Sequence, residues 1–244
     1  MDAISASAAS GMRARMESLE MLANNLANVE TGGFKADREF FSTYTGQDAT
    51  RDPQTGDILN MPVVQSHWTD LTQGNLLTTA NPLDLAIDGD GMFAAVTASG
   101  VRYTRNGNFR ISGAGLLVTA DGNPLRGQDG ATIAIDPGMP VEVLPDGTVQ
   151  QAGQAVGQLE ISSFDRASLD KFGANYFVPV AGAQAKPATG SVVQGRLEQP
   201  NVGAAESSVR LVAIMRQFEM LQKATNIGNE LNRSAIEQVA RVTS

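Results

Sequence analysis

Few side chains in this sequence could do chemistry, and their spacing is not that of an active site. The chain of 244 residues contains one histidine, His67, and no cysteine. No serine-glycine elbow lies near His67, so the pattern of a hydrolase triad is not formed. The lack of cysteine excludes disulfides, thiolate metal sites and a cysteine nucleophile. We therefore predict that His67 is a surface or packing residue and that the protein is not an enzyme.

Two aspartates in the Asp-Gly-Asp-Gly segment at 88–91 could coordinate a cation. An EF-hand loop needs a further oxygen ligand at its fifth position and a glutamate at its twelfth, where this chain has Met92 and Ser99. No Gly-Lys-Ser or Gly-Lys-Thr follows, so the segment is not a phosphate loop either. We interpret it as a hairpin turn, and we predict no catalytic residue, no metal and no cofactor.

The overall charge and the apolar content narrow the classes of partner. A formal net charge of −8 argues against general binding to nucleic acid or to an anionic membrane surface. No window approaches the roughly 18 apolar residues that would span a bilayer, so direct membrane insertion is not expected. The first twenty residues lack an apolar core of the signal-peptide kind, so we predict no cleaved signal peptide.

Short apolar segments alternate with turn residues through the middle of the chain. Examples are LDLAI at 83–87 and MFAAV at 92–96. Asn106-Gly107 and Asp146-Gly147 each favour a tight hairpin. Turns every 8–12 residues with no helical pattern between them are typical of antiparallel β structure. The middle is therefore predicted to form a compact β domain.

The two ends of the chain have the period of helices instead. Near the start, apolar residues recur every three or four positions, at Met12, Met16, Leu19, Leu22, Leu26 and Val29. Near the end they recur in the same way, at Leu211, Ile214, Phe218, Leu221, Ala224, Ile227, Leu231 and Ala235. Val209, Val212, Met215 and Met220 widen this second stripe. Two helices alone bury too little of such wide stripes, so contacts with other chains are expected.

These patterns predict an α+β fold class. The long N- and C-terminal helices are expected to pair as a coiled-coil-like domain, and a central antiparallel all-β domain is expected between them in the sequence. The predicted division is a terminal helical assembly domain at 1–35 and 200–244, an extended connector at 36–82, and the central β domain at 83–199.

Three segments of the chain resemble the flagellar rod and hook proteins. The first segment carries Ala-Asn-Asn-Leu-Ala-Asn at 23–28, followed by Thr31, Gly33, Phe34 and Lys35. The second includes LDLAIDGDGMFAAV at 83–96. The third carries Gly-Arg-Leu-Glu at 195–198, followed by Asn201, Val202, Glu206 and the Phe-Glu-Met of 218–220. The resemblance covers about residues 10–231, in the same order as in the family.

The resemblance implies a structural subunit of the bacterial flagellar basal-body rod, which transmits torque across the periplasm for motility. The implied partners are other rod subunits, copies of the same chain and the flagellar type III export apparatus, through which the chain passes without a cleaved signal peptide. Helix asparagines can hydrogen-bond to a neighbouring chain and fix its register. The expected assembly-interface residues are Asn24, Asn25, Leu26, Asn28, Phe34, Asn201, Val202, Leu211, Ile214, Phe218, Leu221 and Leu231.

The sequence leaves more than one possibility for the type of protein, both within this family and outside it. The length suits a rod subunit of intermediate size, and the start Met-Asp-Ala-Ile resembles the proximal-side type more than the distal-side type. A distal rod subunit or a hook subunit is the alternative within the family. A soluble enzyme or binding module built on the β domain is the alternative from another class.

Overall fold

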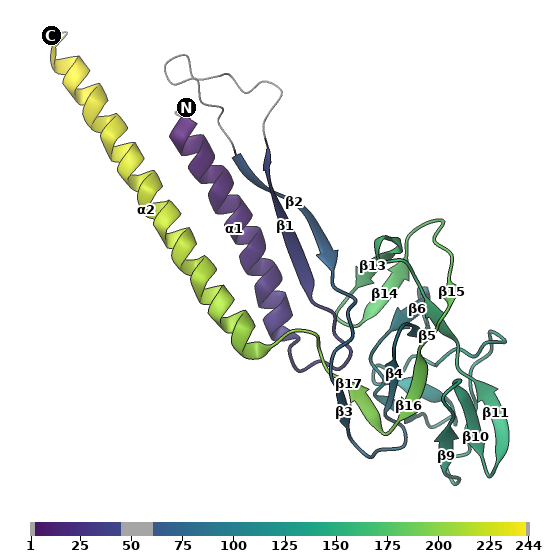
Figure 1. The fold of residues 1–244 in the computed structure, drawn as a ribbon. Helices are drawn as coiled ribbons and strands as arrows, with labels where there is room; N and C mark the ends of the chain where they lie inside the picture. Colours follow the sequence, from purple (N-terminus) through teal and green to yellow (C-terminus); the bar gives the residue numbers. More distant parts are fainter. Residues whose placement is uncertain (1–2, 45–60, 243–244) are drawn as a thin grey trace. The chain divides into compact units, whose positions relative to one another are not determined.

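The computed structural model describes residues 3–44 and 61–242 (Figure 1). Their contacts divide the chain into two compact units. The terminal unit contains α1 (Ala3–Ala27), β1 (Asp37–Tyr44), β2 (Met61–Thr69) and α2 (Ala204–Val242). The β unit contains Asn28–Ala36 and Thr69–Gly203. These boundaries differ from the three segments expected from the sequence, because the segment after α1 belongs to the β unit and β1 and β2 belong to the terminal unit.

The predicted fold class is wrong in its helical part. Most of the described chain is β structure with two α-helices, and these helices do not form a long coiled-coil pair. Helix α1 packs against β1 as well as against α2, and β1 and β2 form a two-stranded sheet. Among the α2 side chains that the structure describes, two are buried, those of Ser207 and Ile214. A coiled coil requires a continuous buried seam on both helices, which α2 lacks.

Helix α1 also buries a different line of residues from the one expected. Its buried positions are Gly11, Ala14, Ser18, Met21, Leu22 and Asn25. Met16, which belongs to the expected stripe, is 51% exposed. The buried side of this helix is therefore formed largely by small and polar residues, and small residues allow close approach of neighbouring backbone. Of the expected stripe within α1, Leu22 is buried, whereas Met12, Leu19 and Leu26 are half-buried.

The β unit is a set of small antiparallel sheets. Its strands are β3 (Leu76–Thr78), β4 (Leu85–Asp88), β5 (Met92–Thr97), β6 (Gly100–Thr104), β7 (Phe109–Ile111), β8 (Leu117–Thr119), β9 (Val141–Val143), β10 (Thr148–Gln151), β11 (Gln154–Gln158), β12 (Ile161–Ser163), β13 (Leu169–Phe172), β14 (Tyr176–Pro179), β15 (Lys186–Pro187), β16 (Ser191–Gln194) and β17 (Arg196–Glu198). The largest sheet has the order β13-β14-β6-β5-β12-β15. Strand β16 pairs with β4, and β17 pairs with β3.

Strand β5 shows how the β unit is packed, because both of its faces are buried. Phe93 and Ala95 lie in one apolar cluster, whereas Met92 and Ala94 lie in a second cluster. Alternation of side chains along a strand places these two sets on opposite faces. The first cluster also contains Val192 of β16, so a strand near the end of the chain completes the core.

One of the three predicted hairpins is confirmed and two are wrong. The segment 88–91 is not a hairpin turn, since β4 pairs with β16 while β5 pairs with β6 and β12. The hairpin at Asp146-Gly147 is confirmed, because β9 and β10 pair on either side of it and Gly147 has φ of +85°. The hairpin at Asn106-Gly107 is wrong, since β6 pairs with β5 and β14 and not with β7. The Gly107 carbonyl instead accepts a hydrogen bond from the backbone of Leu85. The segment is a crossing between sheets, where glycine permits close backbone approach.

Candidate functional site

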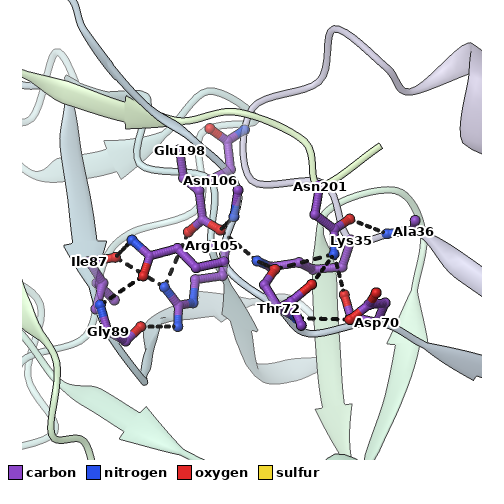
Figure 2. A network of polar contacts seen from close by, with 12 residues as sticks. Lys35, Ala36, Asp70, Thr72, Ile87, Gly89, Arg105, Asn106, Glu198 and Asn201 are labelled. Carbon is purple, nitrogen blue, oxygen red and sulfur yellow. Dashed lines mark hydrogen bonds and ion pairs between the residues drawn. The ribbon is translucent and has the colours of Figure 1, made fainter. Parts of the chain in front are cut away.

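A cluster of buried charges lies in the β unit, formed by Lys35, Arg105 and Glu198 (Figure 2). Lys35 Nζ lies 2.5 Å from Glu198 Oε1, and Arg105 Nη1 lies 3.2 Å from Glu198 Oε2. The side chains of Lys35 and Glu198 are fully buried, and that of Arg105 is 5% exposed. We call these three residues the charge cluster.

Backbone groups supply further hydrogen bonds to the cluster, although Arg105 Nε is buried without a hydrogen-bond partner. Glu198 Oε1 also accepts from the backbone N–H of Gly74, at 2.9 Å. Lys35 donates to the Thr72 carbonyl at 2.6 Å. Arg105 donates to the carbonyls of Ile87 and Gly89, at 3.1 and 2.6 Å. The cluster thereby joins β17 to the loop before β3 and to both ends of the turn that follows β4.

Burial determines the titration of the lysine in this cluster. Loss of water lowers the pKa of Lys35 from its ordinary value, and the neighbouring Glu198 opposes this effect. Arg105 lowers the same pKa further, and the buried Asp70 raises it. A buried lysine with a close carboxylate and a carbonyl acceptor is a structural ion pair, and no open space for a substrate is required to explain it.

Around the cluster, the segment that leaves α1 is tied to the segment that enters α2. The backbone N–H of Gly33 donates to the Glu198 carbonyl at 2.7 Å. Asn201 Oδ1 accepts from the Ala36 N–H at 2.8 Å, and its amide group donates to the Asp70 carbonyl at 2.6 Å. Both segments belong to the β unit, so these contacts fix the two points from which the terminal helices extend.

Phe34 lies in the same region, where the segment that leaves α1 meets the segment that enters α2. We call this region the junction. Phe34 is completely buried, and Lys171 Nζ lies 4.0 Å from the centre of its ring. Lys171 also donates to the carbonyl of Lys35 at 2.9 Å. The aromatic ring therefore packs within its own chain, where a cation–π contact adds to its burial.

In the terminal unit, Asn25 holds the start of β1 against α1. Its amide group donates to the Asp37 carbonyl at 2.8 Å and its Oδ1 accepts from the Asp37 N–H at 3.0 Å. Asn25 is 3% exposed. The preceding residue, Asn24, is exposed. Adjacent asparagines of one motif thus have different environments.

Helix α2 carries a second apolar surface in addition to the buried Ile214. Val209, Met220 and Ile227 are 72%, 62% and 56% exposed. They are 11 and 7 residues apart, which is about three turns and about two turns, so they share one side of the helix. Ile214 follows Val209 by five residues, or about 1.4 turns, and lies on about the opposite side. We call Val209, Met220 and Ile227 the outward face of α2.

Within residues 3–44 and 61–242, no three metal-binding side chains are grouped so that they could hold an ion. No helix in these ranges is long and apolar enough to cross a membrane. His67 is exposed.

Comparisons with known proteins agree in all three parts of the chain. Residues 6–35 match the family described as flagella basal body rod protein. Residues 86–152 match the flagellar hook protein FlgE/F/G D1 domain, and 193–238 match the flagellar basal body rod FlgEFG protein C-terminal region. The rod protein FlgF of Caulobacter vibrioides is 33% identical over 230 residues, covering 92% of each chain.

Two similar FlgG proteins cover the chain to a comparable extent. FlgG of Bacillus subtilis is 32% identical over 250 residues, covering 91% of this chain and 93% of its own. FlgG of Agrobacterium fabrum is 34% identical over 251 residues, covering 92% and 94%. The chain belongs to the flagellar basal-body rod proteins of the FlgF and FlgG type. Members of this rod family are structural proteins, so the chain is a structural rod subunit and not an enzyme.

The structure places the residues expected at the rod protein's assembly interface in three kinds of environment. Asn25, Phe34 and Asn201 make the contacts within the chain described above, and Ile214 is 5% exposed on the inner side of α2. Asn24 is exposed. The half-buried members are Leu26, Asn28, Val202, Leu211, Phe218 and Leu221. The side chain of Leu231 lies outside the described residues, as does the 45–60 part of the expected connector.

The charge cluster was not predicted as a site, although all three of its members lie in segments that resemble the rod family, Arg105 in the RYTRNGNF of 102–109. Lys35 ends the first segment, and Glu198 ends the Gly-Arg-Leu-Glu of the third. They are 163 positions apart. The opposite charges of Lys35 and Glu198 were the available signal, because a charged side chain requires a partner when it is buried.

Proposed function

We propose that this chain assembles into the rod through the outward face of α2, against other rod subunits or copies of itself, and that the assembled rod transmits torque across the periplasm. The observation that supports this role is the exposure of Val209, Met220 and Ile227 along one side of a 39-residue helix. Aligned apolar side chains with this spacing suit a neighbouring helix. Asn24, which is exposed, would add polar contacts to the same kind of interface.

The β unit supports torque transmission in a different way. A shaft under load requires subunits whose own segments do not slip, and the charge cluster joins segments from the start, middle and end of the β unit. Buried ion pairs resist rearrangement, because breaking them leaves uncompensated charge. The load would pass between subunits through helix contacts and within each subunit through this junction.

We also propose that the chain is exported by the flagellar type III apparatus without cleavage of a signal peptide. The absence of cysteine suits passage into an oxidising compartment, since no disulfide can form. A proximal-side position in the rod is favoured by the start Met-Asp-Ala-Ile, and a distal position is the alternative.

Substitution on the outward face tests the assembly role. In the variant with Val209→Gln and Met220→Gln, both side chains stay in water-exposed helix positions, so stability should change by less than about 0.5 kcal/mol per site. Incorporation into purified basal bodies should fall by at least about tenfold, because each apolar side chain loses about 1.5–3 kcal/mol of burial at the interface. Immunoblots of basal bodies and swimming assays provide the readout.

Two matched variants control this experiment. Gln217→Ala with Gln222→Ala changes two other exposed positions of α2 and should leave incorporation unchanged. Ile214→Ala removes a buried side chain and should destabilise the terminal unit by about 2–5 kcal/mol. Normal incorporation of the Val209→Gln, Met220→Gln protein would exclude the outward face as the assembly surface.

A further inference from the structure

Glu198 is a carboxylate that arrives late in the sequence at a site containing two earlier cations. Lys35 and Arg105 precede it by 163 and 93 positions. We propose that the β unit cannot close until the segment 191–201 is available, because Glu198 supplies the counter-charge that makes burial of Lys35 and Arg105 possible. The charge cluster would thereby make folding of the β unit depend on nearly the last residue of that unit.

The contacts of the two cations support this dependence. In the part of the chain that the structure describes, Arg105 has Glu198 as its carboxylate partner, and its other acceptors are the carbonyls of Ile87 and Gly89. Lys35 has Glu198 and the Thr72 carbonyl. Carbonyl groups alone do not compensate a buried positive charge. Without Glu198, both cations would have to remain hydrated, which keeps their segments open.

A second carboxylate, that of Asp70, also acts on the positive charge of Lys35. Asp70 is 5% exposed and acts on Lys35 through its charge, while its Oδ1 accepts from the Thr72 N–H at 3.1 Å. Asp70 also lies 3.8 Å from the exposed guanidinium of Arg166. Asp70 can therefore offset part of the charge of Lys35, but the structure gives it no contact with Arg105.

Strand pairing also makes closure of the β unit depend on the segment that contains Glu198. Strand β16 is the sheet partner of β4, and β17 is the sheet partner of β3. Leu85 and Ile87 of β4 lie in the first apolar cluster, which Val192 of β16 completes. Before residue 198 is present, β3 and β4 have unpaired edges, and the core lacks one of its members. Charge and strand pairing thus both require the same segment.

The consequence for the cell rests on the proposed export route. A chain that emerges with its N-terminus first would keep the β unit open until almost all of that unit had left the channel. Early closure of a partial β domain would be disfavoured by two buried, unpaired cations. The physical claim about folding does not depend on export, so the two can be tested separately.

Pulse-labelling hydrogen exchange during refolding of the full-length protein tests the physical claim. Amides of β5 and β6, at 92–97 and 100–104, should become protected in the same kinetic phase as those of β16 and β17, at 191–198. Protection of β5 and β6 at least tenfold faster than protection of 191–198 would overturn the proposal. A rod-incorporation defect in an outward-face variant would not affect this result.

A pair of carboxylate variants separates counter-charge from simple loss of an ion pair. Glu198→Gln should lower the folded-to-unfolded ratio of the β unit by at least about a hundredfold and expose amides on all of its sheets. Glu160→Gln removes the partner of Arg126, in an ion pair whose side chains are 17% and 33% exposed, and should lower this ratio less than about fivefold. Adding Lys35→Met to Glu198→Gln should restore part of the lost stability. Equal effects of the two single variants, or no recovery in the double variant, would contradict the proposal.

Discussion

The charge cluster and the outward face of α2 differ in which side chains they bury and which they expose. The cluster buries three charged residues and surrounds them with partners from its own chain. The outward face exposes three apolar residues that have no such cover in the isolated subunit. Burial of charge and exposure of apolar surface are both costly, so each is informative where it occurs.

The difference separates residues that build the subunit from those available to join subunits. Several motif residues expected at the assembly interface, among them Phe34 and Asn201, are already used inside the β unit. On the outward face, Met220 belongs to the Phe-Glu-Met motif and is 62% exposed, whereas Val209 and Ile227 lie outside the short motifs. A family motif therefore indicates a position in the fold before it indicates an interface.

The largest expected effect tests how little space the junction leaves. Gly33 has φ of +68°, and a Cβ there would overlap the backbone of Arg105 and Asn106. Gly33→Ala should therefore destabilise the β unit by about 3 kcal/mol or more, measured as the opening free energy of β5 amides in hydrogen exchange. Strain and overlap both contribute to this value.

A second glycine separates those two contributions. Gly173 has the same φ of +68° but nothing within 4 Å of an added Cβ. Gly173→Ala should cost about 1–2 kcal/mol from backbone strain alone. Equal destabilisation by Gly33→Ala and Gly173→Ala would mean that the backbone around Gly33 is not tightly packed. The junction would then differ less from the exposed outward face.

A smaller effect is expected from the two adjacent asparagines of α1. Asn25→Ala removes two hydrogen bonds to the backbone of Asp37 at a buried position, and should cost about 1–3 kcal/mol in the terminal unit. Asn24→Ala changes an exposed residue and should cost less than about 0.5 kcal/mol. Urea unfolding of both full-length variants provides the comparison.

Incorporation into basal bodies should depend on Asn24, although Asn24 contributes less than Asn25 to stability. Asn24→Ala should reduce incorporation into basal bodies without a change in stability, if its side chain contacts a neighbouring subunit. A stable Asn24→Ala protein with full incorporation would remove Asn24 from the assembly surface. A loss of stability in Asn24→Ala equal to that in Asn25→Ala would contradict the distinction between the two positions.

The sequence predicted the local patterns well and the long-range contacts poorly. Short apolar runs bounded by turn residues, such as 92–96, revealed strands, because this pattern depends on neighbouring positions alone. The pairing of Lys35 with Glu198 joins positions 163 apart, which no local pattern can reveal. Helical periodicity likewise predicted two helices but placed Met16 on the buried side of α1, because periodicity does not specify which neighbours a helix meets.

Long-range contacts also explain why the predictions of a coiled-coil pair and of a hairpin at Asn106-Gly107 were wrong. A coiled-coil pair was expected from stripe spacing, yet β1 also packs against α1 and most of the described α2 side chains are not buried. Asn106-Gly107 has the local preference of a hairpin, but Gly107 meets the backbone of Leu85 from a distant strand. In both cases tertiary contacts overrode a correct local preference.

The smallest expected effect is a pH dependence that belongs to the charge cluster and not to the outward face. Burial lowers the pKa of Lys35 below its ordinary value of 10.5. Between the lowered pKa and 10.5 the unfolded chain therefore binds more protons at this lysine than the folded chain does. The contribution of Lys35 to the free energy of unfolding must then increase as pH rises through that window, and decrease as pH falls through the lowered pKa.

Two tyrosines have the opposite linkage and must be separated from this effect. Burial raises the pKa of Tyr103 and of Tyr176, so their contributions are lost as pH rises beyond about 10. Urea unfolding of the wild-type protein and of Lys35→Met from about pH 8 to about pH 10 removes this background, since both proteins keep the tyrosines. The wild-type protein should gain stability relative to Lys35→Met, by no more than about 1.4 kcal/mol per pH unit. Parallel curves would mean that burial does not perturb Lys35, and the cluster would then resemble a hydrated surface ion pair.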